Sequence, residues 1–196
     1  MIQIKDIREM IKEGYPKETI ENLLQQVLIF SLQVKKDYPD YKTWFLTKQI
    51  PGIFDSTRNL IIAHIKDRLV GFVSLKKTDT EKKICTFYVE KSFRKNKIGT
   101  ILVEKAIAYL EEEKPLITIP MDKLGDFIKI GNHYGWKISD IKQGLYREDI
   151  PEVIVNDELR QTEKYLPIAQ TYQKYRKDQF GHMIKYFFHK ICGNLS

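Results

Sequence analysis

The stretch FYVEKSFRKNKIGT, residues 87–100, carries the strongest structural and chemical signal in this chain. Its apolar start is typical of the end of a buried strand, and a run with helical spacing begins at Ile98. Between them lie Arg94, Lys95 and Lys97. Backbone N–H groups in the first turn of a helix have no partner inside the helix, and the helix dipole places partial positive charge there. The stretch therefore predicts a phosphate site, with a solvated basic turn as the alternative.

The segments before this stretch predict an antiparallel sheet. Two apolar runs, Leu60–Ile65 and Leu69–Leu75, are separated by three polar residues, which is typical of a hairpin. A third run, Ile84–Val89, follows a charged turn, so the three strands form a meander. Further upstream we expect a strand at Ile2–Ile7, a helix between Pro16 and Pro39, a short helix at Tyr41–Ile50 and a turn-rich link through Pro51, Gly52 and Asp55.

The segments after the stretch alternate between helix and strand. Apolar residues recur with helical spacing from Ile98 to Glu113, and Pro115 marks the end of that helix. We then expect a strand at Leu116–Ile119, a helix capped by Asp122, and strands at Trp136–Tyr146 and Val153–Val155. Helices on both sides of a central strand predict an α/β architecture.

The composition is that of a globular chain. Its 196 residues fit one domain, with 42% hydrophobic and 30% charged residues. The net charge of +7 favours anionic partners such as coenzyme A, RNA or acidic proteins, while solvated surface lysine is the alternative explanation.

The cysteines, the histidines and the apolar runs bear on disulfides, metal sites and membrane segments. Two cysteines, Cys85 and Cys192, are too few for a disulfide framework, and the four histidines show no ligand spacing, so we expect no metal. No apolar run is long enough to span a membrane, and the N-terminus lacks the apolar core of a signal peptide. We therefore expect a cytoplasmic protein with no membrane partner.

The central stretch resembles the GNAT superfamily, the Gcn5-related N-acetyltransferases. That family carries a strand ending in Val and, five residues later, the motif Arg/Gln-x-x-Gly-x-Gly/Ala. Here Val89 precedes Arg94 at that distance, and residues 94–99 read RKNKIG, with Lys97 in place of the first glycine. The pairs Gly71-Phe72 and Gly135-Trp136 also stand where relatives carry similar pairs. The likeness spans about residues 58–157.

The resemblance implies a mixed, mostly antiparallel bent sheet, splayed between its fourth and fifth strands and flanked by helices. It also implies acetyl-CoA as cosubstrate and direct attack by an amine acceptor. The backbone of Phe87, Tyr88 and Val89 would contact the pantetheine arm, with the Val89 N–H polarising the thioester carbonyl. The pyrophosphate would lie against Arg94, Lys95, Asn96, Lys97, Ile98, Gly99 and Thr100.

The acid and base of the reaction are harder to place. Many relatives have a Tyr four residues before the glycine of the later pair, where this chain has Gly131. Tyr134 is the nearest hydroxyl, with a packing role as the alternative. The run Ile84–Val89 contains no carboxylate or histidine. Because an α-amine loses its proton more readily than a lysine, this absence favours an α-amine acceptor.

Residues 1–157 would form the GNAT domain and residues 158–196 a basic amphipathic helical extension. The extension's apolar stripes would pack on the domain or on a second copy in a homodimer. Its cations and tyrosines suit RNA, including aminoacyl-tRNA as acceptor. Two other classes remain open: a noncatalytic acyl-CoA sensor, and an RNA- or protein-binding module on a GNAT scaffold.

Overall fold

The computed structural model describes residues 1–34, 38, 40–157 and 166–167. The chain divides into two compact units, with the boundary after Leu116. Most of the predicted extension, residues 158–165 and 168–196, lies outside the described residues, so its helices stay a prediction.

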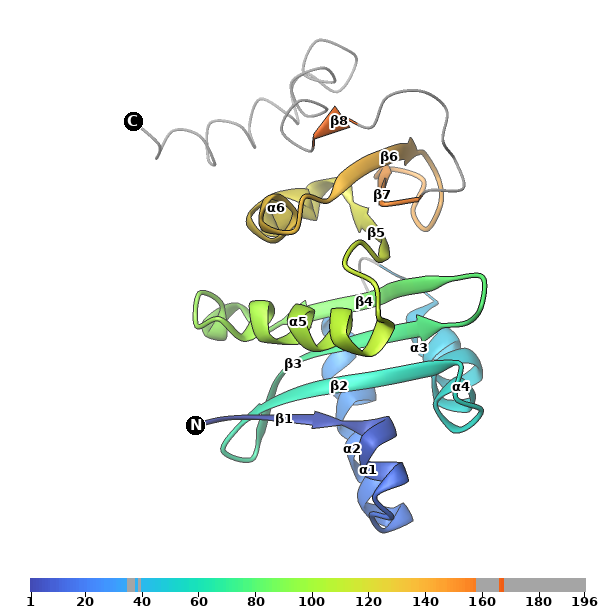
Figure 1. The fold of residues 1–196 in the computed structure, drawn as a ribbon, viewed down its shortest axis with the longest axis vertical. Coiled ribbons are helices and arrows are strands. Elements are labelled where there is room, and N and C mark those ends of the chain that lie inside the picture. Colours follow the sequence, from blue (N-terminus) through green and yellow to red (C-terminus); the bar gives the residue numbers. More distant parts are fainter. Residues whose placement is uncertain (35–37, 39, 158–165, 168–196) are drawn as a thin grey trace. The chain divides into compact units, whose positions relative to one another are not determined.

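The first unit is built on an antiparallel sheet of four strands in chain order (Figure 1). The predicted hairpin and meander are confirmed, and the N-terminal strand pairs with the second strand. The strands are β1 (Ile2–Asp6), β2 (Arg58–Ile65), β3 (Arg68–Lys77) and β4 (Lys82–Val89).

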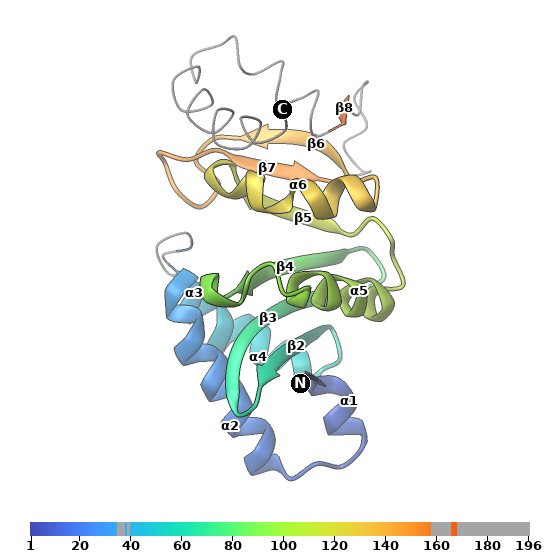
Figure 2. The same ribbon diagram turned by 90° about the vertical axis from the view of Figure 1, so that its left-hand side faces the viewer.

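Helices cover both faces of this sheet. One face packs into a core with Leu60, Ile62 and Phe72 of the sheet. The helical elements on that face are α1 (Ile7–Lys12), α2 (Lys17–Phe30), the 3-10 turn η1 (Ser31–Val34), α3 (Tyr41–Trp44), the π-helical turn η2 (Phe45–Gln49) and α4 (Ile50–Phe54). The opposite face is covered by α5 (Ile98–Leu110) (Figure 2).

Three sequence predictions in this unit need correction. The first strand ends at Asp6, whose carboxylate accepts the Glu9 N–H at 3.0 Å and caps the unpredicted helix α1. Pro51 and Gly52 lie inside α4 rather than in a link, because Pro is tolerated in the first turn of a helix. Helix α5 ends at Leu110 instead of Glu113.

A buried asparagine ties the N-terminal elements to the sheet. The Asn59 side-chain oxygen accepts the N–H groups of Arg8 at 3.1 Å and Leu60 at 2.7 Å. Its side-chain amide donates to the Asp6 carboxylate at 2.9 Å, and its backbone carbonyl accepts from the Gln49 side-chain amide at 2.7 Å. Since buried polar groups are stable only when paired, this network fixes α1 and η2 on β2.

The second unit carries the remaining strands and one helix. Antiparallel pairs join β5 to β7, β7 to β6, and β6 to β8. The elements are β5 (Leu116–Pro120), the 3-10 turn η4 (Met121–Lys123), α6 (Leu124–His133), β6 (Lys137–Lys142), β7 (Glu152–Val155) and β8 (Leu166–Pro167). With helices beside the strands of both units, the predicted α/β class is confirmed.

Three details of this unit differ from the sequence predictions. Asp122 lies within η4 and does not cap α6; its carboxylate accepts from Arg147 at 3.2 Å and from Lys123 at 3.0 Å. The strand expected at Trp136–Tyr146 is shorter, and it runs from Lys137 to Lys142. Leu166 and Pro167 pair with β6 as a strand, where helix was predicted.

Candidate functional site

The predicted phosphate loop connects the end of β4 to the start of α5. After the 3-10 turn η3 (Lys91–Phe93), the chain enters α5 through residues with left-handed backbone. Lys95 has φ 68° and Lys97 has φ 61°. Left-handed residues within a turn direct successive N–H groups into one concavity, which is an arrangement that binds anions. The family's preference for glycine at position 97 is explained by this positive φ, which lysine adopts only at a cost.

Arg94 holds this loop in place. Its Nε donates to the Val89 carbonyl at 3.0 Å, so the side chain turns back onto the strand. Sequence reasoning placed Arg94 among the phosphate contacts; the structure gives its side chain a positioning role as well.

Two glycines allow α5 to approach the sheet. A Cβ at Gly99 would lie 3.3 Å from the Phe87 ring. A Cβ at Gly71 would lie 3.3 Å from Cδ1 of Leu102 in α5 and 3.0 Å from the Tyr88 carbonyl oxygen. The second contact is with backbone, which cannot move aside. These glycines bring the first turn of α5 directly over the end of β4.

The end of β4 presents backbone groups on the side away from β3. Glu90 donates its N–H to the Val70 carbonyl at 2.9 Å, and Val89 stands opposite Gly71 in the ladder. Hydrogen-bonded and non-hydrogen-bonded pairs alternate along an antiparallel ladder. The N–H and C=O groups of Phe87 and Val89 therefore point away from β3, as a strand that contacts an extended ligand requires.

The loop carries excess positive charge. Lys95, Asn96 and Lys97 are exposed, and within the described part of the chain neither lysine forms an ion pair. The nearby carboxylate of Glu90 is engaged by Arg68 and by the Ser92 hydroxyl, at 3.1 Å from the latter. The cations of the loop are thus available to an anionic ligand.

On the face covered by α1 to α4, β4 contributes polar groups that the sequence prediction missed. The Tyr88 hydroxyl donates to Gln33 at 2.6 Å. The hydroxyls of Ser31, Ser74 and Thr86 surround the phenol of Tyr41, and burial raises the pKa of that phenol far above its ordinary value. Isolated Ser and Thr residues in apolar runs gave no signal of this cluster before the structure placed them together.

Tyr134 lies in the second unit, at the end of α6. Its ring stacks on Trp136, with centroids 6.0 Å apart and an interplanar angle of 26°, and His133 meets it edge-on at 4.8 Å. These contacts give Tyr134 the packing role named as the alternative, and its role as an acid stays a prediction. The other predicted site residues, from Phe87 to Thr100, all lie in the first unit.

Across the described residues, no helix is both long and apolar enough to cross a lipid bilayer. In the same part of the chain, His, Cys, Asp and Glu side chains form no group of three that could hold a metal ion.

Solved structures with a similar fold are GNAT proteins. A GNAT-family acetyltransferase from Bacillus cereus is 15% identical, covering 79% of this chain and 95% of that one, at a TM-score of 0.55. An aminoglycoside 6'-N-acetyltransferase solved with coenzyme A is 17% identical, covering 79% of this chain and 94% of that one, at a TM-score of 0.51. The PaiA N-acetyltransferase from Thermoplasma acidophilum was also solved with coenzyme A. It is 16% identical, covering 79% of this chain and 97% of that one, at a TM-score of 0.50.

At these identities the structural likeness shows the fold alone. No curated protein sequence matches the chain significantly. The model of the acetyltransferase (GNAT) family matches residues 17–119, which include strands β2 to β4 of the first unit, the phosphate loop and α5. With more than half of its length matched, the chain belongs to the GNAT acetyltransferase family.

Proposed function

We propose that this protein transfers an acetyl group from acetyl-CoA to a primary amine. The observation that carries the proposal is the cationic loop with left-handed Lys95 and Lys97, directly beside the outward-facing backbone of Val89. In one acetyl-CoA molecule the diphosphate and the thioester stand at the two ends of the pantetheine arm, so the loop would hold the first and the strand the second. Two neighbouring structures contain coenzyme A, which supports the same ligand here.

Each part of the site has a separate task in this proposal. The N–H groups at the start of α5 and the ammonium groups of Lys95 and Lys97 hold the diphosphate. Phe87 and Val89 hydrogen-bond the extended arm through their backbone. Gly71 and Gly99 permit this arrangement by keeping α5 close to β4.

Acetyl-CoA supplies an acetyl group activated as a thioester. The amine nitrogen attacks the carbonyl carbon, the C–S bond breaks, and an amide and a thiol form after one proton moves from nitrogen to sulfur. The Val89 N–H stabilises negative charge on the carbonyl oxygen during the attack.

The acceptor in our proposal is an α-amine. Strand β4, Lys82–Val89, contains no Asp, Glu or His, so it supplies no base to the incoming amine. An α-amine has a pKa of about 7.7–8.0 and is substantially neutral near pH 8, whereas a lysine with a pKa of about 10.4 is not. Aminoacyl-tRNA belongs to this acceptor class, and the net charge of +7 favours its binding. If enzyme and acetyl-CoA leave aminoacyl-tRNA unmodified, aminoacyl-tRNA is excluded as the acceptor.

Replacement of Val89 by proline tests the reaction directly. Proline removes the N–H, but this N–H does not belong to the β3 ladder, so the sheet of the first unit should persist. We expect kcat for thiol release to fall about 100-fold, with little change in the Kd for coenzyme A. An unchanged kcat would exclude the oxyanion role of this residue.

A noncatalytic acyl-CoA sensor is the second candidate. It is favoured by the stacking of Tyr134 on Trp136, which gives that hydroxyl-bearing ring a packing role. The two candidates differ in one measurement: a sensor binds acetyl-CoA in calorimetry but releases no thiol with any α-amine.

A further inference from the structure

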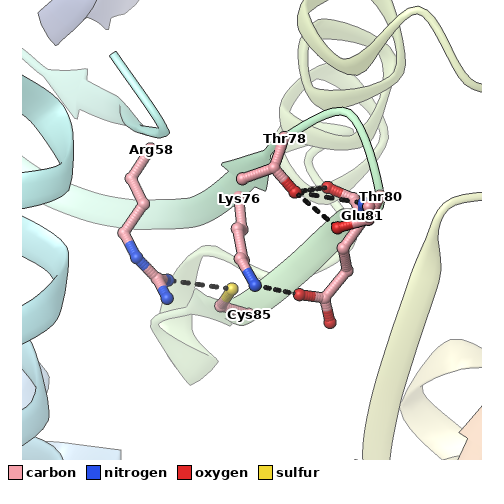
Figure 3. Close-up of polar contacts among 6 residues, drawn as sticks. All are labelled: Arg58, Lys76, Thr78, Thr80, Glu81 and Cys85. Atoms are coloured by element: carbon pink, nitrogen blue, oxygen red, sulfur yellow. Dashed lines mark hydrogen bonds and ion pairs between the residues drawn. The ribbon is translucent and has the colours of Figure 1, made fainter. Parts of the chain in front are cut away.

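Arg58, at the start of β2, differs from the other arginines of the described residues. Four of them donate to an oxygen atom: Arg8, Arg68, Arg94 and Arg147. The hydrogen-bond partner of Arg58 is a sulfur atom, Sγ of Cys85, at 3.5 Å from Nη1 (Figure 3). Because a guanidinium has five N–H donors and stays charged, a weak sulfur acceptor leaves most of its capacity unused.

The chain nevertheless holds Arg58 firmly. The guanidinium lies over the Trp44 ring, 5.4 Å from its centroid. A Cβ at Gly52 would lie 2.5 Å from Cδ and 2.7 Å from Cγ of Arg58, so the aliphatic stem rests on the backbone of α4. Glycine inside a helix costs about 1 kcal/mol, and here it makes room for this side chain.

The π-helical turn η2 helps to position Trp44 and Gly52 against Arg58. Trp44 and Gly52 are eight residues apart, which would place them about 80° apart around the axis of a regular α-helix. A π turn takes up one extra residue, so the two positions face the same direction, as residues seven apart do in an α-helix.

No carboxylate of the described residues forms an ion pair with Arg58, although its charge, after the hydrogen bonds from Thr57, helps to lower the pKa of Asp55. The carboxylate of Glu81 is paired with the ammonium of Lys76 (Figure 3). The carboxylate of Asp55 is exposed and accepts from the hydroxyl and the N–H of Thr57, at 2.6 and 3.0 Å. Burial raises the pKa of the Cys85 thiol above its ordinary value, although Arg58 acts in the opposite direction, so this partner stays uncharged near neutral pH.

Arg58 lies on the face of the sheet opposite the phosphate loop. Cys85 is the extra residue of a β-bulge in β4, where Ser74 pairs with Thr86 and Leu75 with Ile84. Along β4, Cys85 precedes Val89 by four residues, which is roughly 13 Å of extended strand. Acetyl-CoA bound from the α5 face and an amine substrate bound from the face of Arg58 can therefore meet along this strand.

We propose that Arg58, seated on Trp44 and Gly52, binds a carboxylate of the amine acceptor. The inference rests on the proposed function and names its substrate class: a primary amine with a carboxylate roughly 13 Å away, the span of a short extended peptide. The planar fork of the guanidinium matches a carboxylate with two parallel hydrogen bonds.

Matched peptides test the proposal on the full chain. Triglycine, tetraglycine and pentaglycine are each offered with acetyl-CoA as the free acid and as the C-terminal amide. For the best length we expect kcat/KM to be about tenfold higher for the free acid, the value of one charge-assisted contact. In Arg58→Met, which keeps the aliphatic stem, the ratio falls to near one, while the Kd for coenzyme A is unchanged.

Two controls separate recognition from folding and from general charge. Lys48→Gln removes an exposed cation from the same helical segment and should keep the tenfold ratio. Arg58→Lys keeps charge but loses the fork, so it should give an intermediate ratio. A ratio near one in the wild type at every length overturns the proposal, whatever the variants do.

The outcome does not depend on turnover. If coenzyme A binds but neither the peptides nor aminoacyl-tRNA are acetylated, the enzyme proposal fails, and the same peptide pairs are titrated into the coenzyme A complex by calorimetry. A tenfold tighter Kd for the free acid, lost in Arg58→Met, still supports the site. Equal affinity for acid and amide removes it.

Discussion

The two ends of α5 use the same kinds of residue for different purposes. At each end a charged residue adopts left-handed backbone: Lys97 with φ 61° before the helix, and Glu111 with φ 52° after it. At the C-terminal end the charged groups of Lys77, Lys82 and Glu111 all have partners. Lys77 donates to the Tyr109 carbonyl at 3.0 Å and pairs with the Glu111 carboxylate at 3.0 Å, and Lys82 donates to the Glu111 carbonyl at 3.0 Å.

At the N-terminal end the lysines of the loop form no ion pair with a described residue. Cations at a helix C-terminus stabilise the helix, whereas cations at its N-terminus oppose the dipole and suit an added anion. In our proposal, backbone strain and charge without compensation are retained in this loop because a bound diphosphate supplies the missing partner. The comparison separates residues that stabilise the fold from residues that bind.

Charge reversal at the N-terminal end gives the largest expected effect. In Lys95→Glu with Lys97→Glu, two charge-assisted contacts to the diphosphate are lost, so we expect the Kd for coenzyme A to rise at least about 100-fold. The free energy of unfolding of the protein alone should not fall, and should rise by up to about 1 kcal/mol, because carboxylates at a helix N-terminus favour the helix dipole. Calorimetry and urea unfolding measure the two quantities.

The control for this experiment lies on the same helix. Lys105 is exposed on α5, outside the loop. If Lys105→Glu weakens coenzyme A as much as the double variant does, then net charge alone governs binding and the loop has no special role.

Removal of Lys77 should have the opposite profile. Lys77→Met deletes a hydrogen bond to a helix-terminal carbonyl and an ion pair, so we expect a loss of about 1 kcal/mol of unfolding free energy. The Kd for coenzyme A should stay within about twofold of the wild-type value. A stability equal to that of Lys105→Met would show that the C-terminal contacts contribute nothing.

Glycine at position 97 separates backbone from charge. Lys97→Gly relieves the left-handed strain and should raise the unfolding free energy by about 0.5–1 kcal/mol, while the lost cation weakens coenzyme A several-fold. Glu111→Gly relieves similar strain but also removes the pair with Lys77, so its net effect should be smaller. Equal gains in the two variants would mean that the Lys77 pair has no net value.

Much of this architecture follows from local sequence. The strands of the first unit have apolar runs separated by polar turns, and α5 has a clear helical stripe, so both could be predicted. The loop was found because cations between a strand and a helix have a chemical meaning without any knowledge of the fold. Helix α1 was missed because six residues are too few to show a period.

The contacts of Arg58 with Trp44, Gly52 and Cys85 could not be predicted from the sequence, and the reason is different. Pro51 and Gly52 are signals of a turn, and they lie in a helix because a side chain from β2 packs on the glycine. Trp44, Gly52 and Cys85 come together only through tertiary packing. The same holds for the hydroxyls around Tyr41, each of which is an ordinary residue in its own segment.

The smallest effect in the comparison depends on pH. The hydrogen bond and charge of Lys77 hold the pKa of Glu111 below its ordinary value. A carboxyl with a lowered folded-state pKa stabilises the protein above its unfolded-state pKa, and this stabilisation is lost as the pH falls through the folded-state value. Urea unfolding from pH 6 down to pH 3 should therefore show a slightly weaker pH dependence in Glu111→Gln than in the wild type. Because Glu111 is exposed, added salt should reduce this difference, and a difference that persists in high salt would place the origin of the lowered pKa elsewhere.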